Sequence, residues 1–528
     1  MVIIKIIKLQ RSLYNLQLST NSLQGFSCPI ATSASGSAST LQSLNITQSG
    51  LEVLALLAQA GDKFSEDCLT INVWTKPQTG DAQKAVLVWI YGGGFSTGNS
   101  DNPGYNGQYF AEQEDVVLVS FNYRLNVFGF PGIPNATQNL GLLDQRLAIE
   151  WVRDNIAAFG GDPSRITIFG QSAGSASVDY YTYAWASDPI VHSYIEESGS
   201  VFGPAPGLGP ITADVAAGSW LSLSSALGCG SPNSTNSSST AILSCMKSQP
   251  MPAILSAMGT MDASSQSPIP SNFGPTVDNV VVFSNYTAQS MAGNFSTLPL
   301  LLGNADYEAG LFRILDALKN VSLSDAAWDA FNSDGFVCPC ATRANFSLAN
   351  KVPTWRYRWF GAFPNTELTT IPFSGAWHAS ELPVLFNNVP FGAGVPPSTD
   401  AEVQIGDYIR GAWAAFAKDP VNGLTSYQDG WPMYDPSGQT LIRLGFNNQT
   451  GTNLAMGDMY DGACAGVVSV SVGGNGTSGG NGSNSSSPSP SATGSAPGPT
   501  TSKGAGVAMA VEVTGLIGVV VAIGFAAL

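Results

Sequence analysis

The stretch that decides the fold, RITIFGQSAGSASVDYY, spans residues 165–181. Its β-branched and aromatic start is typical of a buried strand, and the small residues after Gly174 are compatible with a helix. Between them, Gly170-Gln171-Ser172-Ala173-Gly174 forms the pattern G-x-S-x-G. In a strand–turn–helix context this pattern places the serine on a tight, strained turn at a helix N-terminus, where negative charge is favoured. We therefore interpret Ser172 as a nucleophile.

The segments around this turn predict an α/β fold. Short apolar runs alternate with helix-like segments, as in sheets covered by helices. The helix-like segment 142–159 repeats apolar residues at roughly helical spacing and is followed by the breaker Asp162-Pro163. The strand candidates are residues 84–93, 115–123, 165–170, 298–304 and 355–361.

A glycine run directly after the first of these strand candidates predicts an oxyanion hole. The residues Tyr91-Gly92-Gly93-Gly94-Phe95 allow the backbone to turn several N–H groups toward one point. A tetrahedral intermediate needs such donors. We expect the N–H groups of Gly93 and Gly94, together with that of Ala173, to supply them.

A serine nucleophile also needs a base and an acid that orients it, and the chain has only two histidines. His378 follows the strand candidate 355–361, whereas His192 lies only 20 residues after Ser172. The chain order Ser–acid–His of α/β hydrolases favours His378. For the acid, Asp306 and Glu308 both follow the strand candidate 298–304, and spacing alone does not choose between them.

These motifs together resemble the type-B carboxylesterase/lipase family, which includes cholinesterases and fungal lipases. The resemblance implies an α/β-hydrolase fold with a central, mostly parallel sheet flanked by helices. It spans roughly residues 65–390, and its serine and GAWH segments are highly specific. The matching segments are SEDCLTINVW (65–74), VWIYGGGFSTG (88–98), SFNYRLNVFGF (120–130), the block from Asn139 to Gly174, EESGS (196–200), GNADYEAGLF (303–312) and GAWHASELPVLF (375–386).

The resemblance also implies roles for individual residues. The family's acid is a glutamate in a G-x-x-x-x-E loop, and Gly303 to Glu308 matches that count, so Glu308 is favoured over Asp306. Ser198 is then expected near the triad of Ser172, Glu308 and His378, and Arg124 and Asp144 are expected to form a buried ion pair. The implied disulfides are Cys28–Cys68 and Cys229–Cys245, with Cys464 joined to either Cys338 or Cys340.

The function expected from these residues is hydrolysis of a carboxylic ester through an acyl-enzyme, with a small molecule or a lipid as substrate. The alternative is a non-catalytic cell-surface adhesion protein on the same fold. No cofactor or metal motif is present, and none is needed. Residues 51–57 form either a lid helix that meets an ester chain or a helix packed on the body. The loop 28–68 contains no Trp, which disfavours a choline-binding aromatic cage.

Composition indicates a secreted glycoprotein. Only 11% of the 528 residues are charged, and the net charge of −16 disfavours binding to nucleic acid. Scattered cysteines and dense glycosylation sequons predict the secretory pathway, although no oligomeric state follows. The sequons begin at Asn45, Asn135, Asn233, Asn236, Asn285, Asn294, Asn320, Asn345, Asn448, Asn475, Asn481 and Asn484.

Four segments are expected along the chain. Residues 1–27 have no signal-peptide pattern and resemble a faulty gene start. Residues 28–465 form the α/β-hydrolase domain, and 466–506 form a stalk rich in Ser, Gly, Asn and Pro. Residues 507–528 have the layout of a GPI-attachment signal, which predicts a cell-surface protein; a single membrane-spanning helix is the alternative.

Overall fold

A computed structural model describes residues 2–7, 25–31, 44–77, 83–203, 209–230, 239–263 and 272–464, with the backbone alone at 2–7, 262 and 263. The expected stalk, residues 466–506, and the expected GPI-attachment signal, residues 507–528, lie outside these residues. Among the described helices, none is long and apolar enough to cross a membrane.

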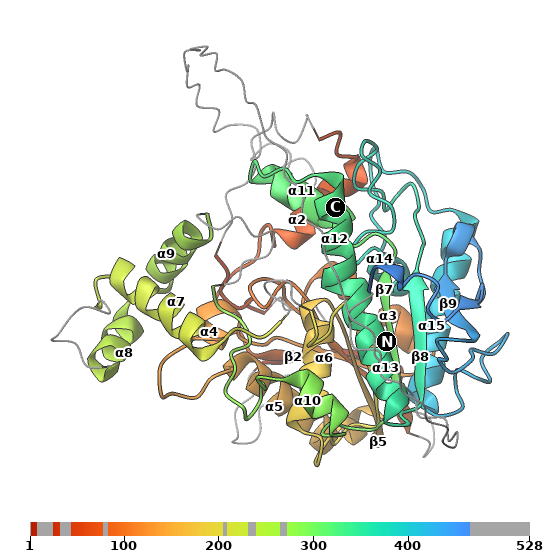
Figure 1. Ribbon diagram of the computed structural model, residues 1–528, viewed down its shortest axis with the longest axis horizontal. Coiled ribbons are helices and arrows are strands. Elements are labelled where there is room, and N and C mark those ends of the chain that lie inside the picture. Colours follow the sequence, from red (N-terminus) through yellow and green to blue (C-terminus); the bar gives the residue numbers. More distant parts are fainter. Residues whose placement is uncertain are drawn as a thin grey trace, which may run out of the picture. The chain divides into compact units, whose positions relative to one another are not determined.

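A ten-stranded sheet forms the centre of the described structure, in the order β1-β2-β4-β3-β5-β6-β7-β8-β9-β10 (Figure 1). All neighbours from β4 through β9 run parallel, and the outer pairs β1–β2, β2–β4 and β9–β10 are antiparallel. The mostly parallel sheet predicted from the sequence is therefore confirmed. The strands are β1 Val2–Ile7, β2 Thr70–Thr75, β3 Lys84–Ile90, β4 Val117–Phe121, β5 Gly161–Gln171, β6 Ser193–Glu197, β7 Leu300–Ala305, β8 Thr354–Trp359, β9 Gln439–Leu444 and β10 Ala455–Met456.

Helices cover both faces of the sheet. Buried parallel strands read as continuous apolar runs, as β3 (KAVLVWI) does, because neither face meets water. The helices are α2 Gln48–Leu57, α3 Gln108–Gln113, α4 Asn126–Gly129, α5 Leu140–Asn155, α6 Ala173–Ala184, α7 Ala213–Ala226, α8 Ser239–Ser248, α9 Met251–Ala263, α10 Tyr286–Met291, α11 Ala309–Leu318, α12 Asp325–Asn332, α13 Cys338–Ala349, α14 Glu381–Leu385 and α15 Asp400–Lys418.

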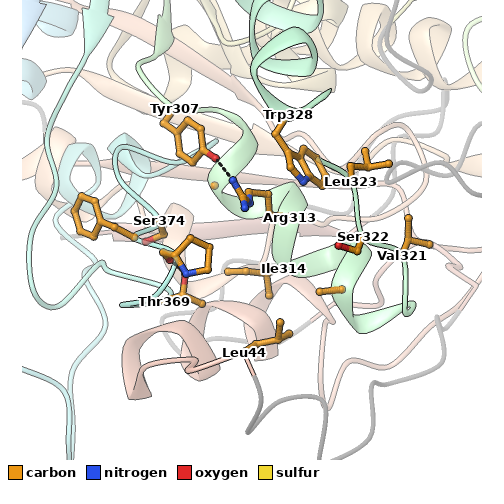
Figure 2. Close-up of a pocket in the computed structure, with 14 residues that line it drawn as sticks. Leu44, Tyr307, Arg313, Ile314, Val321, Ser322, Leu323, Trp328, Thr369 and Ser374 are labelled. Carbon is orange, nitrogen blue, oxygen red and sulfur yellow. Dashed lines mark hydrogen bonds between the residues drawn. The ribbon is translucent and has the colours of Figure 1, made fainter. Parts of the chain in front are cut away.

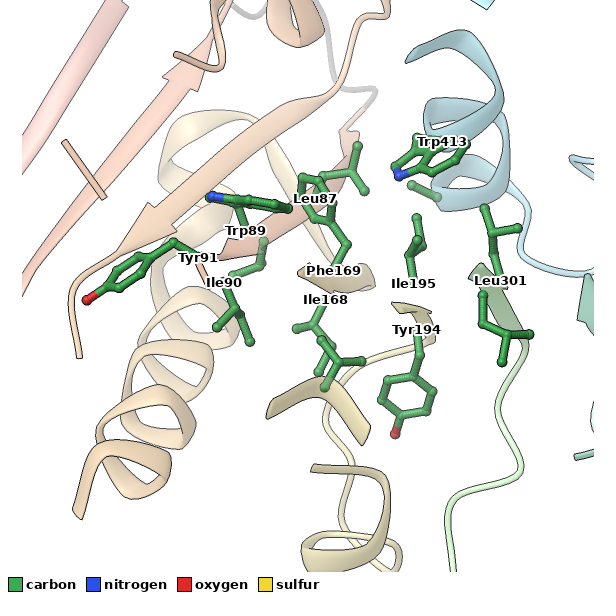
Figure 3. Close-up of a cluster of buried hydrophobic side chains, with 14 of the residues drawn as sticks. Leu87, Trp89, Ile90, Tyr91, Ile168, Phe169, Tyr194, Ile195, Leu301 and Trp413 are labelled. Atoms are coloured by element: carbon green, nitrogen blue, oxygen red, sulfur yellow. The ribbon is translucent and has the colours of Figure 1, made fainter. Parts of the chain in front are cut away.

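The core divides by the alternation of side chains along the central strands. Figure 3 shows Trp89 and Phe169 on the side of the sheet where Trp413 of α15 packs, and Ile168 and Tyr194 on the other side. The second side is covered by α5, α6 and α13, since α6 packs on β5 and β6 and α13 packs on β7 and β8. The side chains of both layers are buried, which defines the positions of the strands.

The helices α7, α8 and α9 form a separate small cluster (Figure 1, left). Their apolar side chains include Trp220, Ile242 and Met258, and they pack with one another rather than on the sheet core. The disulfide Cys229–Cys245 links the end of α7 to α8. A short local core of this kind gains rigidity from such a crosslink.

The remaining cysteine pairs are also defined. Cys28–Cys68 forms as the resemblance implied, and Cys338–Cys464 resolves the pairing that the sequence left open. Cys340 is a free, buried thiol. All three disulfides agree with an oxidising compartment.

Two elements near the N-terminus refine the sequence predictions. Val2–Ile7, for which no role was expected, pairs with β2 over its whole length as the edge strand β1. Helix α2 packs on the body through Val53, which is buried with Leu311 and Trp377, as one of the two expectations for this segment had it. Leu56 and Leu57 are exposed, and a role as a lid stays a prediction.

The helix α5 ends earlier than expected. A short 3-10 turn, Ile156–Phe159, follows it, and Gly160 adopts a left-handed conformation with φ of 79°. The chain therefore turns at Gly160, and Asp162-Pro163 belongs to the start of β5. The predicted ion pair is confirmed: Arg124 Nε lies 2.7 Å from Asp144 Oδ2, with the carboxylate buried and the guanidinium partly exposed.

The glycines around the β5–α6 turn generate a stability prediction. A Cβ on Gly174 would overlap the carbonyl oxygen of Ile90 and lie 2.8 Å from its carbon, both rigid backbone atoms of β3. We expect Gly174→Ala to lower the free energy of unfolding by about 3 kcal/mol. The thermal unfolding midpoint, followed by circular dichroism, measures this loss.

Gly218 in α7 is the matched control, because a Cβ there would meet nothing within 4 Å. Gly218→Ala should stabilise the protein by about 0.5–1 kcal/mol, since alanine favours the helix. An unchanged midpoint for Gly174→Ala would contradict the close packing of this turn.

Candidate active site

The topology brings the three predicted catalytic residues to one edge of the sheet. Ser172 follows β5, Glu308 follows β7 and His378 follows β8, and these parallel strands end at the same edge. Strand β6 lies between β5 and β7, so its last residue, Glu197, and the following Ser198 are also part of this edge.

Ser172 occupies a strained turn. Its φ of 59° and ψ of −124° are disfavoured for a residue with a side chain. The backbone N–H of Ser172 donates to the Glu197 carbonyl at 2.8 Å. Glycines surround the turn, since a Cβ on Gly92 would lie 2.8 Å from Ser172 Cβ and one on Gly199 would overlap the Ser172 carbonyl. The turn is therefore held by close backbone packing on two sides.

The glycine loop lies against this turn through Gly92. Gly93 and Gly94 have φ values of 110° and 61°, which glycine adopts without a steric penalty. In the part of the chain that the structure describes, neither of their N–H groups donates to another residue. Ala173 begins α6, where the first N–H groups lack partners within the helix. These donors are free for a ligand oxygen.

Glu308 and His378 form a short, buried contact. His378 Nδ1 lies 2.5 Å from Glu308 Oε2, and neither residue is exposed by more than 4%. The other carboxylate oxygen accepts the Ala305 N–H at 2.7 Å, and the Glu308 N–H donates to Asn332 Oδ1. The carboxylate is thus fixed at both oxygens and directs the imidazole ring.

Two aromatic rings enclose the imidazole, and neither was expected from the sequence motifs. Phe312 and Phe336 lie with their ring centroids 4.9 and 4.8 Å from that of His378. Phe312 is one helical turn after Glu308, so its spacing could have indicated this position. Phe336 comes from a short π-helix, Ser333–Val337, and no sequence pattern marks it.

The imidazole has a further neighbour at its other nitrogen. The side-chain nitrogen of Gln171 lies 3.1 Å from His378 Nε2, and both side chains are buried. Gln171 occupies an unspecified position of the G-x-S-x-G pattern, so the sequence motif predicted no role for its side chain.

Two more buried carboxyl groups lie close to the site. Glu197 accepts from the Trp413 indole at 2.7 Å, and burial raises its pKa to about 8. Glu381 has no hydrogen-bond partner at either carboxylate oxygen among the described residues. Burial, together with the charges of Glu197 and Glu308, raises the pKa of Glu381 well above its usual range. The site therefore lies in a region of low polarity with an excess of acidic groups.

The remaining candidates are placed as follows. Asp306 pairs with Arg358 rather than with His378: its Oδ1 lies 2.8 Å from Arg358 Nε. His192 lies at the amino-terminal end of β6, the opposite edge from Ser172, where its Nδ1 accepts the Ile166 N–H. Ser198 Oγ is 3.3 Å from the Ala305 N–H, beside Glu308.

A separate cavity of about 150 Å³ lies on the face of α11 that carries Gly310 and Ile314 (Figure 2). Arg313 lines it and donates to the Tyr307 hydroxyl at 2.9 Å. Neither Ser172 nor His378 lines this cavity. Among the described residues, no cluster of His, Cys, Asp and Glu could hold a metal ion.

Comparisons with known proteins agree with this geometry. A sequence model described as the carboxylesterase family matches residues 27–334, more than half of the chain. The chain belongs to the carboxylesterase family. This membership confirms the resemblance and the α/β-hydrolase fold.

Three relatives extend the comparison. Chlorogenic acid esterase of Aspergillus niger is 36% identical over 410 residues, which cover 73% of this chain and 74% of the relative. Secreted lipase 5 of Gibberella zeae is 31% identical over 427 residues, which cover 74% of this chain and 75% of the relative. Cholinesterase of Mus musculus is 32% identical over 432 residues, which cover 72% of this chain and 69% of the relative. This carboxylesterase-family chain is a carboxylic ester hydrolase, and the adhesion alternative receives no support.

The buried acid Glu197 generates a prediction about pH and stability. Its folded pKa of about 8 lies above the ordinary value, so folded protein binds a proton that unfolded protein releases between those two values. Stability therefore falls as pH rises through this window. Glu197→Gln keeps an oxygen for Trp413 without the charge and should raise the unfolding midpoint at pH 8.5 relative to the unchanged protein.

At pH 4.5 the same substitution should have little effect, because the carboxyl group is then largely protonated in the folded protein. Thermal unfolding at both pH values measures the difference. An equal change in the midpoint at both would contradict a buried, titrating Glu197.

Proposed function

We propose that this carboxylesterase cleaves esters through an acyl-enzyme on Ser172, with His378 as base and Glu308 as the acid that orients it. The observation that carries this proposal is the buried 2.5 Å contact between His378 Nδ1 and Glu308 Oε2. This contact supports the tautomer that carries its proton on Nδ1, which leaves the lone pair on Nε2 to accept a proton.

In the first half of the reaction, Ser172 Oγ attacks the ester carbonyl carbon while its proton passes to His378 Nε2. The carbonyl electrons move to the oxygen, which accepts hydrogen bonds from the N–H groups of Gly93, Gly94 and Ala173. Collapse of this intermediate breaks the bond to the alcohol oxygen. The alcohol takes the proton from His378 and leaves the acyl group on Ser172.

In the second half, water attacks the acyl carbonyl and gives a proton to the same nitrogen. Collapse breaks the bond to Ser172 Oγ, which recovers its proton from His378, and releases the acid. Glu308 stabilises the imidazolium formed in each half without becoming protonated.

The substrate is proposed as a small-molecule or lipid ester. Relatives named as an esterase of chlorogenic acid and as a lipase support this range. Leu56 and Leu57 on the exposed side of α2 offer apolar surface to an ester chain. The loop 28–68 lacks a Trp, so we do not propose choline esters.

We also propose that the chain is secreted, glycosylated and held at the cell surface by a GPI anchor, as release of intact protein by phospholipase C would test. Three disulfides and a relative named as a secreted lipase support an extracellular location. Sequon asparagines that are exposed can accept glycans, unlike Asn345, which is half-buried and accepts from Tyr434. The exposed ones are Asn45, Asn135, Asn285, Asn294, Asn320 and Asn448.

Removal of the nucleophile tests the reaction. Ser172→Ala should lower kcat for a p-nitrophenyl ester by about 10⁴-fold or more and abolish covalent labelling by a fluorophosphonate. Steady-state kinetics and mass spectrometry measure the two effects. Ser222→Ala, an exposed serine of α7, should leave both unchanged; turnover retained by Ser172→Ala would overturn the proposal.

The two acidic residues of the β7–α11 loop form a matched pair. Glu308→Gln should reduce kcat by about 10⁴-fold, because the amide no longer stabilises the imidazolium or fixes its tautomer. Asp306→Asn should stay within about tenfold of the original kcat, since that carboxylate pairs with Arg358. The opposite ranking in kinetics at pH 8 would assign the acid to Asp306.

A further inference from the structure

Gln171 is the last residue of β5, directly before Ser172. Its side chain is 4% exposed, and its amide nitrogen lies 3.1 Å from His378 Nε2. This is the nitrogen that the proposed function requires as the acceptor of the Ser172 proton. The contact therefore concerns the reacting atom itself.

The chemistry of the imidazole defines the direction of this hydrogen bond. A neutral imidazole carries one N–H and one lone pair. With the N–H directed from Nδ1 to the Glu308 carboxylate, Nε2 can only accept, and the Gln171 carboxamide donates to it. The lone pair of the base is thus already used in the free enzyme.

We propose that Gln171 is a positioning residue that caps His378 Nε2 in the free enzyme and releases it when an ester occupies the site. This inference rests on the proposed function. With Glu308 at Nδ1 and Gln171 at Nε2, the ring is held at both nitrogens and between the rings of Phe312 and Phe336. The base is therefore preoriented before substrate arrives.

A carboxamide suits this position because it has a donor and an acceptor on one group. It donates to neutral imidazole, and after a half-turn of its amide it can accept from the imidazolium that forms during catalysis. An ionised carboxylate could only accept, and an apolar side chain could do neither.

The neighbouring charges explain why a neutral residue is favoured here. Gln171 is the register partner of Glu197 on β6, on the same face of the sheet. Glu308 at the start of α11 is the carboxyl group that contacts the imidazole, and an ionised carboxylate at position 171 would repel it. Glu381 on α14 and Tyr357 on β8 are coupled electrostatically to Glu197 and Glu308. Burial raises the pKa of Glu197 and of Glu381, which favours their neutral forms.

Two substitutions test the proposal by the pH profile of kcat/KM for a p-nitrophenyl ester. Gln171→Met removes the donor that stabilises neutral imidazole, so the pKa of the acidic limb should rise by about 0.5–1, the worth of one neutral hydrogen bond. Gln171→Glu supplies an acceptor for the imidazolium and should raise that pKa by about 1 or more.

Gln145→Met is the matched control. Gln145 is also buried, but its amide donates to Ser177 on α6 rather than to His378. The acidic limb of the kcat/KM profile of Gln145→Met should coincide with that of the unchanged enzyme. A rise in KM alone, with the acidic limb unmoved in Gln171→Met, would overturn the capping role; if Gln171→Glu does not fold, Gln171→Met decides.

Labelling by a fluorophosphonate separates this inference from the proposed function. If Gln171→Met and the unchanged enzyme are both labelled at Ser172 and share one pH profile, the capping role fails while the acyl-enzyme proposal stands. If Ser172→Ala still turns over ester, the proposed function itself fails.

Discussion

The structure around the candidate site depends on one crowded crossing, where the turn from β5 to α6 passes against the end of β3. Gly170 and Gly174 both approach the Ile90 carbonyl, and Gly92 approaches Ser172 from the following loop. With Cβ atoms at these places the strand, turn and helix could not come so close. The strained conformation of Ser172 is maintained because this packing leaves the backbone no room to relax.

Strand β6 connects this crossing to the proposed acid and base. It lies between β5 and β7, so its end contacts the β5–α6 turn and the β7–α11 loop: the Glu197 carbonyl accepts from Ser172, and Ser198, directly after β6, lies beside Ala305. The same position buries the Glu197 side chain next to Trp413. The site is therefore built on a rigid strand that supplies support rather than a reacting group.

Much of this could be predicted from the sequence, and the exceptions have physical reasons. The apolar runs of β3, β4, β5, β7 and β8 indicated the sheet because buried parallel strands are continuously apolar. The strands β1, β2, β9 and β10 were not among the strand candidates. They lie at or next to the two edges of the sheet, and pairing with a neighbouring strand, which has no local sequence signal, defines them. The motif indicated Ser172, yet spacing did not separate Asp306 from Glu308; that difference lies in which carboxylate meets Arg358 and which meets His378. Contacts such as Gln171 with His378 join residues 207 apart in sequence and have no local signal.

The disulfide Cys338–Cys464 has a mechanical consequence. It joins Cys464 to the start of α13, 126 residues earlier, and the nearby Asp461 pairs with Arg356 of β8. Tension applied to the chain beyond residue 464 would enter the fold at α13, which packs on β7 and β8 in the interior. The disulfide would therefore pass a pull from the C-terminal side to this interior helix before it reached the short edge strand β10.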